Sequence, residues 1–295
     1  MKNDFQEENL IKENKESTRK NFVYWIIIIF SISMAIVVFY ITTEKFDKQY
    51  ISSSTISGKK IHQVMFGYNC DKVAEKVKNE ISKIEETISS EIYGSDVEKI
   101  NKSEGKWVKV NKLTIEILEK VINISKYTHG IYDPTYLNLV NIYKNQKNIS
   151  KNDLQKELKK INYKFIKIDK EYDRVRIENG GTFLTLDDIL DGLFCNKAIE
   201  IYKSSKISKA LVKIGNTTGY FNYAEEKNTE PKNGFTCNLS ESEIVVNSKT
   251  GELSNSPYSF CHPTDGILAN ILARTCVFLD EKESRNLKNF FMLDS

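Results

Sequence analysis

An uncharged segment near the N-terminus constrains this chain more than any other feature of its sequence. No residue from Asn21 to Thr43 is charged, and the run WIIIIFSISMAIVVFYI within it is rich in Ile, Val and Phe. A helix needs about 20 apolar residues to cross the hydrocarbon core of a bilayer. Tyr24, Trp25 and Tyr40 lie near the ends of the run, where aromatic rings favour the membrane interface. The pattern therefore predicts a transmembrane helix over residues 21–43.

A cleaved signal peptide and a buried core helix are the alternatives for this segment. The apolar run exceeds a signal h-region of about 7–15 residues, and no small-residue cleavage site follows it. No cysteine lies beside the run, which argues against a lipoprotein anchor. We therefore expect an uncleaved, single-pass anchor in the cell membrane.

Basic residues flank the segment almost equally on both sides, so the positive-inside rule gives only a slight preference for one orientation of the helix in the membrane. Long domains that follow a span are translocated largely regardless of local charge. The expected topology has the polar tail, residues 1–20, in the cytoplasm and the C-terminal domain outside it. Residues 44–60 are polar and read as a linker, so the extracytoplasmic domain is expected to span residues 61–295.

Periodicity in residues 61–295 predicts an α+β domain. Apolar residues at helical spacing predict four helices, and alternating or short apolar runs predict strands between them. Asp133 and Pro134 predict the start of a further helix, with Asp133 as its N-cap. The helices are expected at 70–89, 113–128, 187–206 and 266–279, and the strands at 61–68, 107–110, 163–169, 174–179, 182–186, 209–215 and 256–263. These elements do not follow a regular βαβ spacing, so an α+β fold is favoured over a doubly wound sheet.

The composition excludes several classes of function. A net charge of +3, without a basic stripe interleaved with aromatics, argues against a nucleic-acid partner. None of the five cysteines forms a CxxC pair, so neither a zinc ribbon nor a complete disulfide framework is indicated.

Three aspartates lie close together in the stretch TLDDILDG, residues 185–192. If a helix begins here, Asp187, Asp188 and Asp191 fall at spacings that could place them on one face. The stretch has three interpretations: a metal-binding cluster, a solvated helix N-terminus, or the altered form of another site.

The order of several segments resembles the ApbE family, the FAD:protein FMN transferases. IYDPTYLNLV is similar to the family's FDPTVGPLV, and LTLDDILDGLFCNKAIEIY falls where the family has DLGGIAKGYAVDRAAE. KALVKIGNTTGY, VNSKTGEL and ILANILARTCVFL fall in turn where the family has ALVNAGGDI, HIIDPRTGKP and LADALATALFVLG. The matching segments are collinear from about Ile61 to Met292. The resemblance implies an ApbE-like single domain, with a mixed sheet and flanking helices, behind the transmembrane helix.

The resemblance also implies a chemistry and a partner. Family members bind FAD, use Mg²⁺ at its pyrophosphate, and transfer FMN to a threonine of a flavin-carrying subunit of a membrane electron-transfer system. Carried over position by position, the cofactor-binding residues would be Tyr93, Asp133, Thr135, Asp188, Gly192 and Thr250. The metal would be held by Asn270 and by the backbone carbonyl of Leu190. No residue is assigned a catalytic role.

The motif that should contact the phosphates and the metal departs from the family pattern. Asp187 and Asp188 replace two glycines, Asp191 replaces a lysine, and Arg274 replaces a threonine that binds the metal. Carboxylates repel a pyrophosphate, and arginine cannot bind a cation. Three hypotheses follow: a membrane-anchored FMN transferase with a reworked metal site, a catalytically dead pseudoenzyme that binds a membrane flavoprotein, and a domain that is similar in fold alone.

Overall fold

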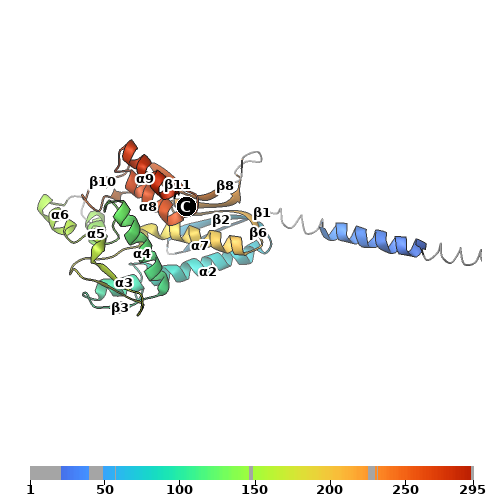
Figure 1. Ribbon diagram of the computed structural model, residues 1–295, viewed down its shortest axis with the longest axis horizontal. Helices are drawn as coiled ribbons and strands as arrows, with labels where there is room; N and C mark the ends of the chain where they lie inside the picture. Colours follow the sequence, from blue (N-terminus) through green and yellow to red (C-terminus); the bar gives the residue numbers. More distant parts are fainter. Residues whose placement is uncertain are drawn as a thin grey trace, which may run out of the picture. The chain divides into compact units, whose positions relative to one another are not determined.

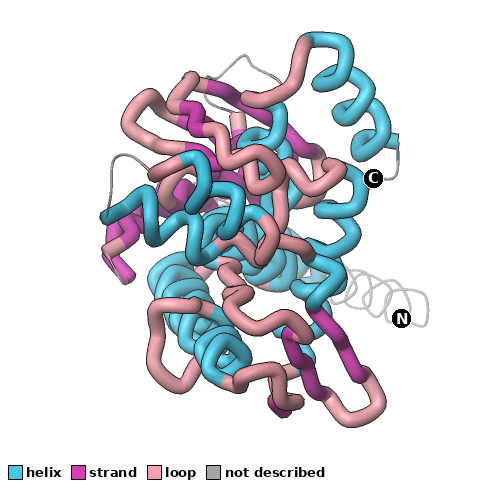
Figure 2. Tube along the Cα trace, turned by 90° about the vertical axis from the view of Figure 1, so that its left-hand side faces the viewer, coloured by secondary structure: helices cyan, strands magenta, loops and turns pink. Residues whose placement is uncertain are grey.

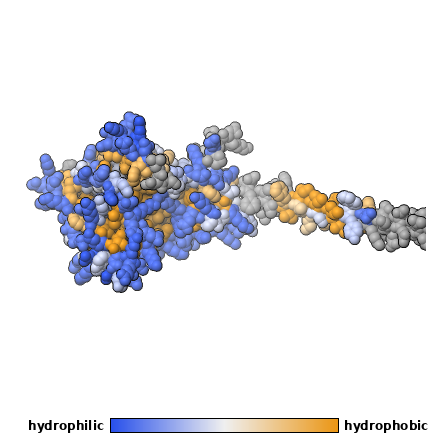
Figure 3. All heavy atoms as spheres, in the orientation of Figure 1, coloured by the Kyte–Doolittle hydropathy of each residue, from blue (hydrophilic) through white to orange (hydrophobic). Residues whose placement is uncertain are grey.

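The structure is a computed structural model that describes residues 21–39, 49–56, 58–145, 149–224, 230 and 232–293. The chain forms two units, Met1–Lys48 and Gln49–Ser295. In the first unit, helix Asn21–Phe39 is long and apolar enough to cross a membrane, although a signal sequence near an N-terminus has the same properties. All its side chains are exposed, and Figure 3 shows that most of them are hydrophobic. Residues 1–20 and 40–48, where the polar tail, the end of the span and part of the linker were predicted, lie outside the described residues.

The linker prediction is wrong for residues 49–60, because these residues open the second unit. Strand β1 (Gln49–Ile56) pairs along its whole length with β2 (Lys59–Gly67) as an antiparallel hairpin. The strand was missed because its sequence, QYISSSTI, is mostly polar. As the edge strand of a sheet it keeps much of its surface exposed, so the apolar alternation that marks a buried strand is absent.

A six-stranded sheet forms the centre of the second unit (Figure 1). Every pairing between neighbouring strands is antiparallel, in the order β1-β2-β6-β7-β8-β11. The other four strands are β6 (Ile207–Ile214), β7 (Thr217–Tyr223), β8 (Lys232–Leu239) and β11 (Tyr258–His262). In β6 the buried Ala210, Val212 and Ile214 alternate with more exposed residues, as expected for a sheet covered on one face.

Three helices cover that face of the sheet: α2 (Cys70–Ile88), α7 (Leu190–Ser204) and α8 (Gly266–Cys276). Helix α7 lies between the other two and packs on β6 and β7, while α8 packs on β8 and β11. The predicted helical spacing in α2 is confirmed, since Val73, Val77, Ile81, Ile84 and Ile88 are all buried.

A second group of elements packs beside this layer, and several of them, including α3, α4 and β5, contribute to the same hydrophobic core. A three-stranded sheet has the order β3-β5-β4, and β9 and β10 form a separate hairpin. Helix α9 lies at the edge of the unit, next to the C-terminus (Figure 2). The elements are α3 (Asp96–Lys102), β3 (Val108–Lys109), α4 (Lys112–Tyr127), α5 (Leu137–Asn145), α6 (Lys151–Leu158), β4 (Ile166–Asp169), β5 (Arg174–Ile177), β9 (Val245–Val246), β10 (Leu253–Ser254) and α9 (Glu281–Leu293), with 3-10 turns η1 (Tyr163–Phe165) and η2 (Asp187–Ile189).

The α+β prediction is confirmed, but two local predictions are wrong. Residues 182–186 do not form a strand; Phe183 makes only an isolated parallel bridge to Tyr136. Asp133 is not a helix N-cap, since α5 begins at Leu137. The Asp133 carboxylate instead accepts hydrogen bonds from Thr135 and from the backbone N–H of Tyr163, 30 residues further along the chain. The carboxylate therefore connects the turn at residues 133–135 to the segment that contains Tyr163.

Candidate functional site

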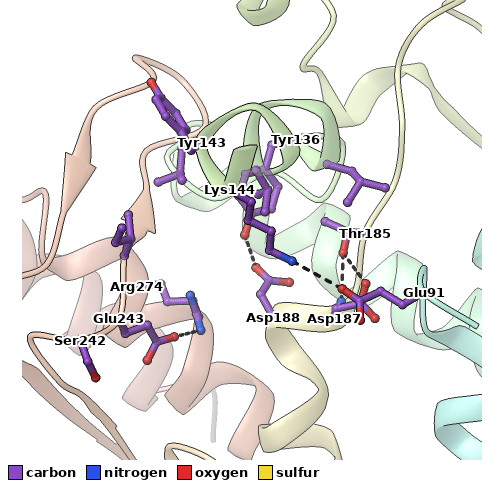
Figure 4. Close-up of a pocket in the computed structure, with 14 residues that line it drawn as sticks. Glu91, Tyr136, Tyr143, Lys144, Thr185, Asp187, Asp188, Ser242, Glu243 and Arg274 are labelled. Atoms are coloured by element: carbon purple, nitrogen blue, oxygen red, sulfur yellow. Dashed lines mark hydrogen bonds and ion pairs between the residues drawn. The ribbon is translucent and has the colours of Figure 1, made fainter. Parts of the chain in front are cut away.

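A cavity of about 460 Å³ lies between α5, the η2 turn that precedes α7, the loop after β8 and helix α8 (Figure 4). Its walls combine apolar side chains, including Leu137, Val140 and Ile244, with six charged ones. Four of the charged residues are acidic and two are basic, a formal charge of −2. The charged residues are Glu91, Asp187, Asp188, Glu243, Lys144 and Arg274.

Asp187 lies on the cavity wall, but its carboxylate is occupied by the turn that follows α2. It accepts hydrogen bonds from Ser89 Oγ at 2.7 Å, from the Ser90 backbone N–H at 3.1 Å and from Thr185 Oγ1 at 3.0 Å. The Ser90 hydroxyl donates to it as well. Such a saturated carboxylate holds two chain segments together and has little capacity left for a ligand.

Asp188 keeps free bonding capacity. Its Oδ2 accepts a hydrogen bond of 2.7 Å from the Tyr136 hydroxyl, whereas its buried Oδ1 has no partner among the described residues. Burial raises the pKa of Asp188, although the positive charge of Arg274 and the hydrogen bond from Tyr136 oppose this effect.

Asp191 belongs to a different contact. Its carboxylate forms an ion pair of 2.6 Å with Lys59, at the β1–β2 hairpin, and accepts the backbone N–H of Asn216 at 3.2 Å. The three aspartates therefore do not act together. Among the residues that the structure describes, no group of three or more His, Cys, Asp or Glu side chains could hold a metal.

Arg274 connects helix α8 to the loop after β8. Its guanidinium pairs with Glu243 and donates from Nε to Asn270 Oδ1 at 3.1 Å. Asn270 in turn donates to Thr217 Oγ1 at 3.2 Å, and Asn216 donates to Glu243. Burial alone would lower the pKa of Arg274, but the negative charges of Glu243 and Asp188 outweigh it and raise the pKa above its ordinary value. The guanidinium is therefore a fixed positive charge in the cavity wall.

These residues do not fit a magnesium ion. Asn270 Oδ1, the one side-chain oxygen expected to bind the metal, already accepts a hydrogen bond from Arg274. A cation placed beside it would be repelled by the guanidinium. The FAD pyrophosphate fits no better, because the cavity wall carries two more negative than positive charges. The residues expected at the phosphates thus have the wrong charge for them.

The structure brings few of the predicted site residues together. Asp188 lines the cavity, and Asn270 contacts Arg274. The Leu190 side chain is buried in the core, and the metal-binding role of its backbone carbonyl stays a prediction. Tyr93 is 89% exposed and its ring faces Lys102, while Thr250 is an exposed residue of the β9–β10 turn.

Gly192, Asp133 and Thr135 lie in packed regions away from the cavity wall. A Cβ at Gly192 would stand 2.2 Å from the carbonyl oxygen of Gly266, so this glycine allows α7 and α8 to pack closely. Thr135 donates to Asp133 and accepts the backbone N–H of Asn162. All three are therefore explained by packing or by local hydrogen bonds.

Glu243 and Tyr136 were not among the predicted site residues. Glu243 lies in the polar sequence SESE, which has no feature that marks a pocket residue. Asn270 and Arg274 lie four residues apart on one predicted helix, the spacing at which side chains contact each other. This spacing was the sequence signal for the contacts around Arg274.

Replacing Asp188 with asparagine is expected to raise the melting temperature at neutral pH. Since the pKa of Asp188 is higher in the folded chain than the unfolded value of about 3.9, stability falls as the pH rises from that value through the folded pKa. Asparagine removes this loss and still accepts the Tyr136 hydrogen bond. Melting curves measured from about pH 4 to pH 7 should show a gap between variant and parent that widens with pH.

Asp187→Asn is the matched comparison, and it should melt below the parent because its amide cannot accept hydrogen bonds at both former oxygens. An Asp188→Asn protein that melts below the parent at pH 7 would contradict the account of Asp188.

Solved structures of ApbE proteins have a fold similar to that of this chain. The crystal structure of the ApbE protein from Thermotoga maritima has a TM-score of 0.73 at 19% identity, with 83% of this chain and 92% of that chain covered. The Pseudomonas stutzeri flavinyl transferase ApbE has a TM-score of 0.72 at 15% identity, covering 83% and 89%. The Vibrio cholerae flavin transferase ApbE has a TM-score of 0.70 at 14% identity, covering 81% and 90%. No curated protein matched in a sequence search.

A family model described as the ApbE family matches residues 51–230, which is more than half of the chain. The match includes most of the β1–β2 hairpin, helix α7 and the β6–β7 hairpin. The chain therefore belongs to the ApbE family.

Proposed function

We propose that this chain is a membrane-anchored ApbE-family protein that does not transfer FMN and instead binds a flavin-carrying membrane protein. The observation that carries the proposal is the Arg274–Glu243 ion pair beside Asn270. Phosphoryl transfer needs a cation that bridges the phosphates. Here the cation of the cavity wall is a protein side chain, already paired with a carboxylate.

The charges around the ion pair support the same conclusion. Asp187 and Asp188 stand where backbone approach to phosphates would need glycines, and Asp187 is committed to the turn after α2. Replacing small residues with carboxylates adds repulsion toward a pyrophosphate. The scaffold, in contrast, is preserved over most of the chain, with the TM-scores given above. A fold kept while ligand residues change is consistent with selection for binding rather than catalysis.

The helix Asn21–Phe39 supports the membrane part of the proposal. An uncleaved anchor would keep the domain at the membrane surface, where a flavin-carrying electron-transfer subunit would also be found. The partner is inferred from the family resemblance, and Mg²⁺ and FAD are not expected as tightly bound cofactors.

An FMN-transfer assay tests the proposal. The full chain in detergent is incubated with FAD, Mg²⁺ and a threonine-containing acceptor subunit, and the acceptor is examined for in-gel flavin fluorescence. The Vibrio cholerae flavin transferase, assayed on the same acceptor, is the positive control. We expect no fluorescent acceptor with this chain and co-purification of the chain with the unmodified acceptor.

A fluorescent acceptor band would contradict the proposal and favour the second candidate, a transferase with a rebuilt metal site. Loss of that band in Arg274→Met would then place Arg274 in the transfer reaction itself.

A further inference from the structure

We infer that the open face of the six-stranded sheet binds the surface of an anionic lipid bilayer. The helices α2, α7 and α8 pack on the other face. There Tyr202 of α7 donates a hydrogen bond to Gln63 of β2. Asn270 of α8 likewise donates to Thr217 of β7. The inference rests on the membrane anchor of the proposed function, but on none of the residues that line the cavity beside Arg274.

An apolar strip crosses four neighbouring strands on the open face. It consists of four residues, each the direct partner of the next: Ile51 on β1, Val64 on β2, Leu211 on β6 and Tyr220 on β7. Directly paired residues point to the same side of a sheet, so the four side chains are continuous. Ile51 is 57% exposed at the edge of the sheet, and Leu211 and Tyr220 are partly exposed.

The neighbouring row of paired residues crosses all six strands. It runs through Ser53, His62, Lys213, Thr218, Thr236 and Cys261. Side-chain contacts at both ends of the row confirm that these residues share a face. Ser53 Oγ lies 2.9 Å from His62 Nδ1, and Thr236 Oγ1 lies 3.2 Å from Cys261 Sγ. Lys213 and Cys261 are exposed.

The six strands contain no Asp or Glu, although 40 of the 295 residues of the chain are acidic. Their lysines are Lys59, Lys60, Lys209, Lys213 and Lys232. Lys59 turns to the covered face, where it pairs with Asp191. Lys60, Lys209 and Lys213 lie on the open face, and none of them forms an ion pair with a described residue. Because no strand supplies a carboxylate, the open face is positively charged around its apolar strip.

A bilayer surface matches this combination of an apolar strip and flanking lysines. Ammonium groups reach the phosphates of anionic lipids, while apolar side chains enter the boundary with the acyl chains. Lys209 Nζ lies 4.2 Å from the centroid of the Phe66 ring, so its alkyl stem extends the apolar surface. An acidic protein surface would match the lysines as well and is the competing partner.

The length of chain before β1 favours the bilayer over a protein. Nine residues separate helix Asn21–Phe39 from Gln49, the first residue of β1. Fully extended, nine residues reach about 30 Å. A bilayer that holds the anchor is therefore within reach of the open face, at an effective concentration that a free partner does not have.

Fluorescence of the full chain labelled at Cys261 tests the inference. Cys261 is exposed and the other four cysteines are buried, so a thiol-reactive nitrobenzoxadiazole label attaches at one position. The chain is reconstituted into vesicles of phosphatidylcholine, with or without the anionic lipid phosphatidylglycerol, that also carry a lipid-bound nitroxide. We expect the nitroxide to quench the label in anionic vesicles and much less in neutral ones. High salt should reverse the quenching, because it screens the lysines from the lipid charge.

Lys213→Met should lower the ratio of docked to undocked chain about fivefold, the usual contribution of one lysine at an anionic surface. Adding Lys60→Met should lower it by a similar factor again. Lys203→Met is the matched control, since Lys203 is an exposed lysine of α7, in the helix layer behind the sheet. Its loss should leave the quenching unchanged. Equal melting temperatures of the variants and the parent show that each variant folds.

Two results would overturn the inference: equal quenching in neutral and anionic vesicles, or an equal loss of quenching in Lys203→Met and Lys213→Met. A label that leaves water only when an acceptor flavoprotein subunit is added would also overturn it, and would assign the face to a protein.

Flotation of the vesicles after carbonate extraction separates this inference from the anchor. A chain that floats with the vesicles while its label stays in water contradicts the docking alone. A chain that carbonate removes contradicts the anchor, and with it the inference.

Discussion

Arg274→Met is expected to lower the free energy of unfolding by about 3 kcal/mol, as when one partner of a buried ion pair is removed. The substitution leaves Glu243 without its cation and Asn270 without its donor. The side chains of Arg274 and Glu243 are only 16% and 20% exposed, so water compensates poorly for the lost pair. Chemical denaturation, monitored by circular dichroism, measures the change.

Two variants sharpen this test. Arg285→Met removes an arginine from an exposed pair with Glu281 on α9 and should cost less than about 0.5 kcal/mol. Adding Glu243→Gln to Arg274→Met removes the unpaired charge and should recover part of the stability. A loss below about 1 kcal/mol in Arg274→Met would show that the ion pair does not stabilise the cavity wall.

Gly192→Ala is expected to destabilise the chain by about 3 kcal/mol, near the upper end of the usual cost of overpacking. The new Cβ would stand 2.2 Å from the Gly266 carbonyl oxygen. Because the obstacle is backbone, helices α7 and α8 would have to separate, and both support the residues around Arg274. Chemical denaturation again measures the loss.

Gly180→Ala provides the matched control for this substitution. A Cβ at Gly180 meets no atom within 4 Å, and its backbone is not in the left-handed region, so a change within about 0.5 kcal/mol is expected. If Gly192→Ala were as stable as Gly180→Ala, the close helix contact would be wrong, and a cofactor-binding role for Gly192 would regain support.

The sequence predicted the elements whose apolar residues repeat regularly and missed those whose residues do not. Helix α2 was predictable because its buried residues follow the helical period. Strand β1 was taken for a linker because an edge strand can be built from serine and threonine. The strand expected at residues 182–186 failed because its apolar residues, such as Leu184 and Leu186, are buried in an irregular segment. The local sequence pattern predicts that a segment is buried, but it does not show whether the backbone of that segment forms a regular strand.

The candidate site was less predictable than the fold, because its contacts join distant parts of the chain. Asp188 lines the cavity, yet its hydrogen-bond partner Tyr136 lies 52 residues away in the sequence. Glu243 and Arg274 are 31 residues apart, and nothing in either local sequence indicates their pairing. The family resemblance located the region, and only the three-dimensional structure showed that an ion pair lies beside the expected metal ligand Asn270.

Manganese binding, measured by electron paramagnetic resonance on the full chain in detergent, tests most directly whether Arg274 takes the place of the metal. Mn²⁺ is the spectroscopic probe for the Mg²⁺ site that the family resemblance implies. If Arg274 takes the place of the metal, the chain binds no Mn²⁺ tightly, and neither Mg²⁺ nor a chelator changes its melting temperature. One Mn²⁺ bound per chain, displaced by Mg²⁺ and lost in Asp188→Asn, would contradict it.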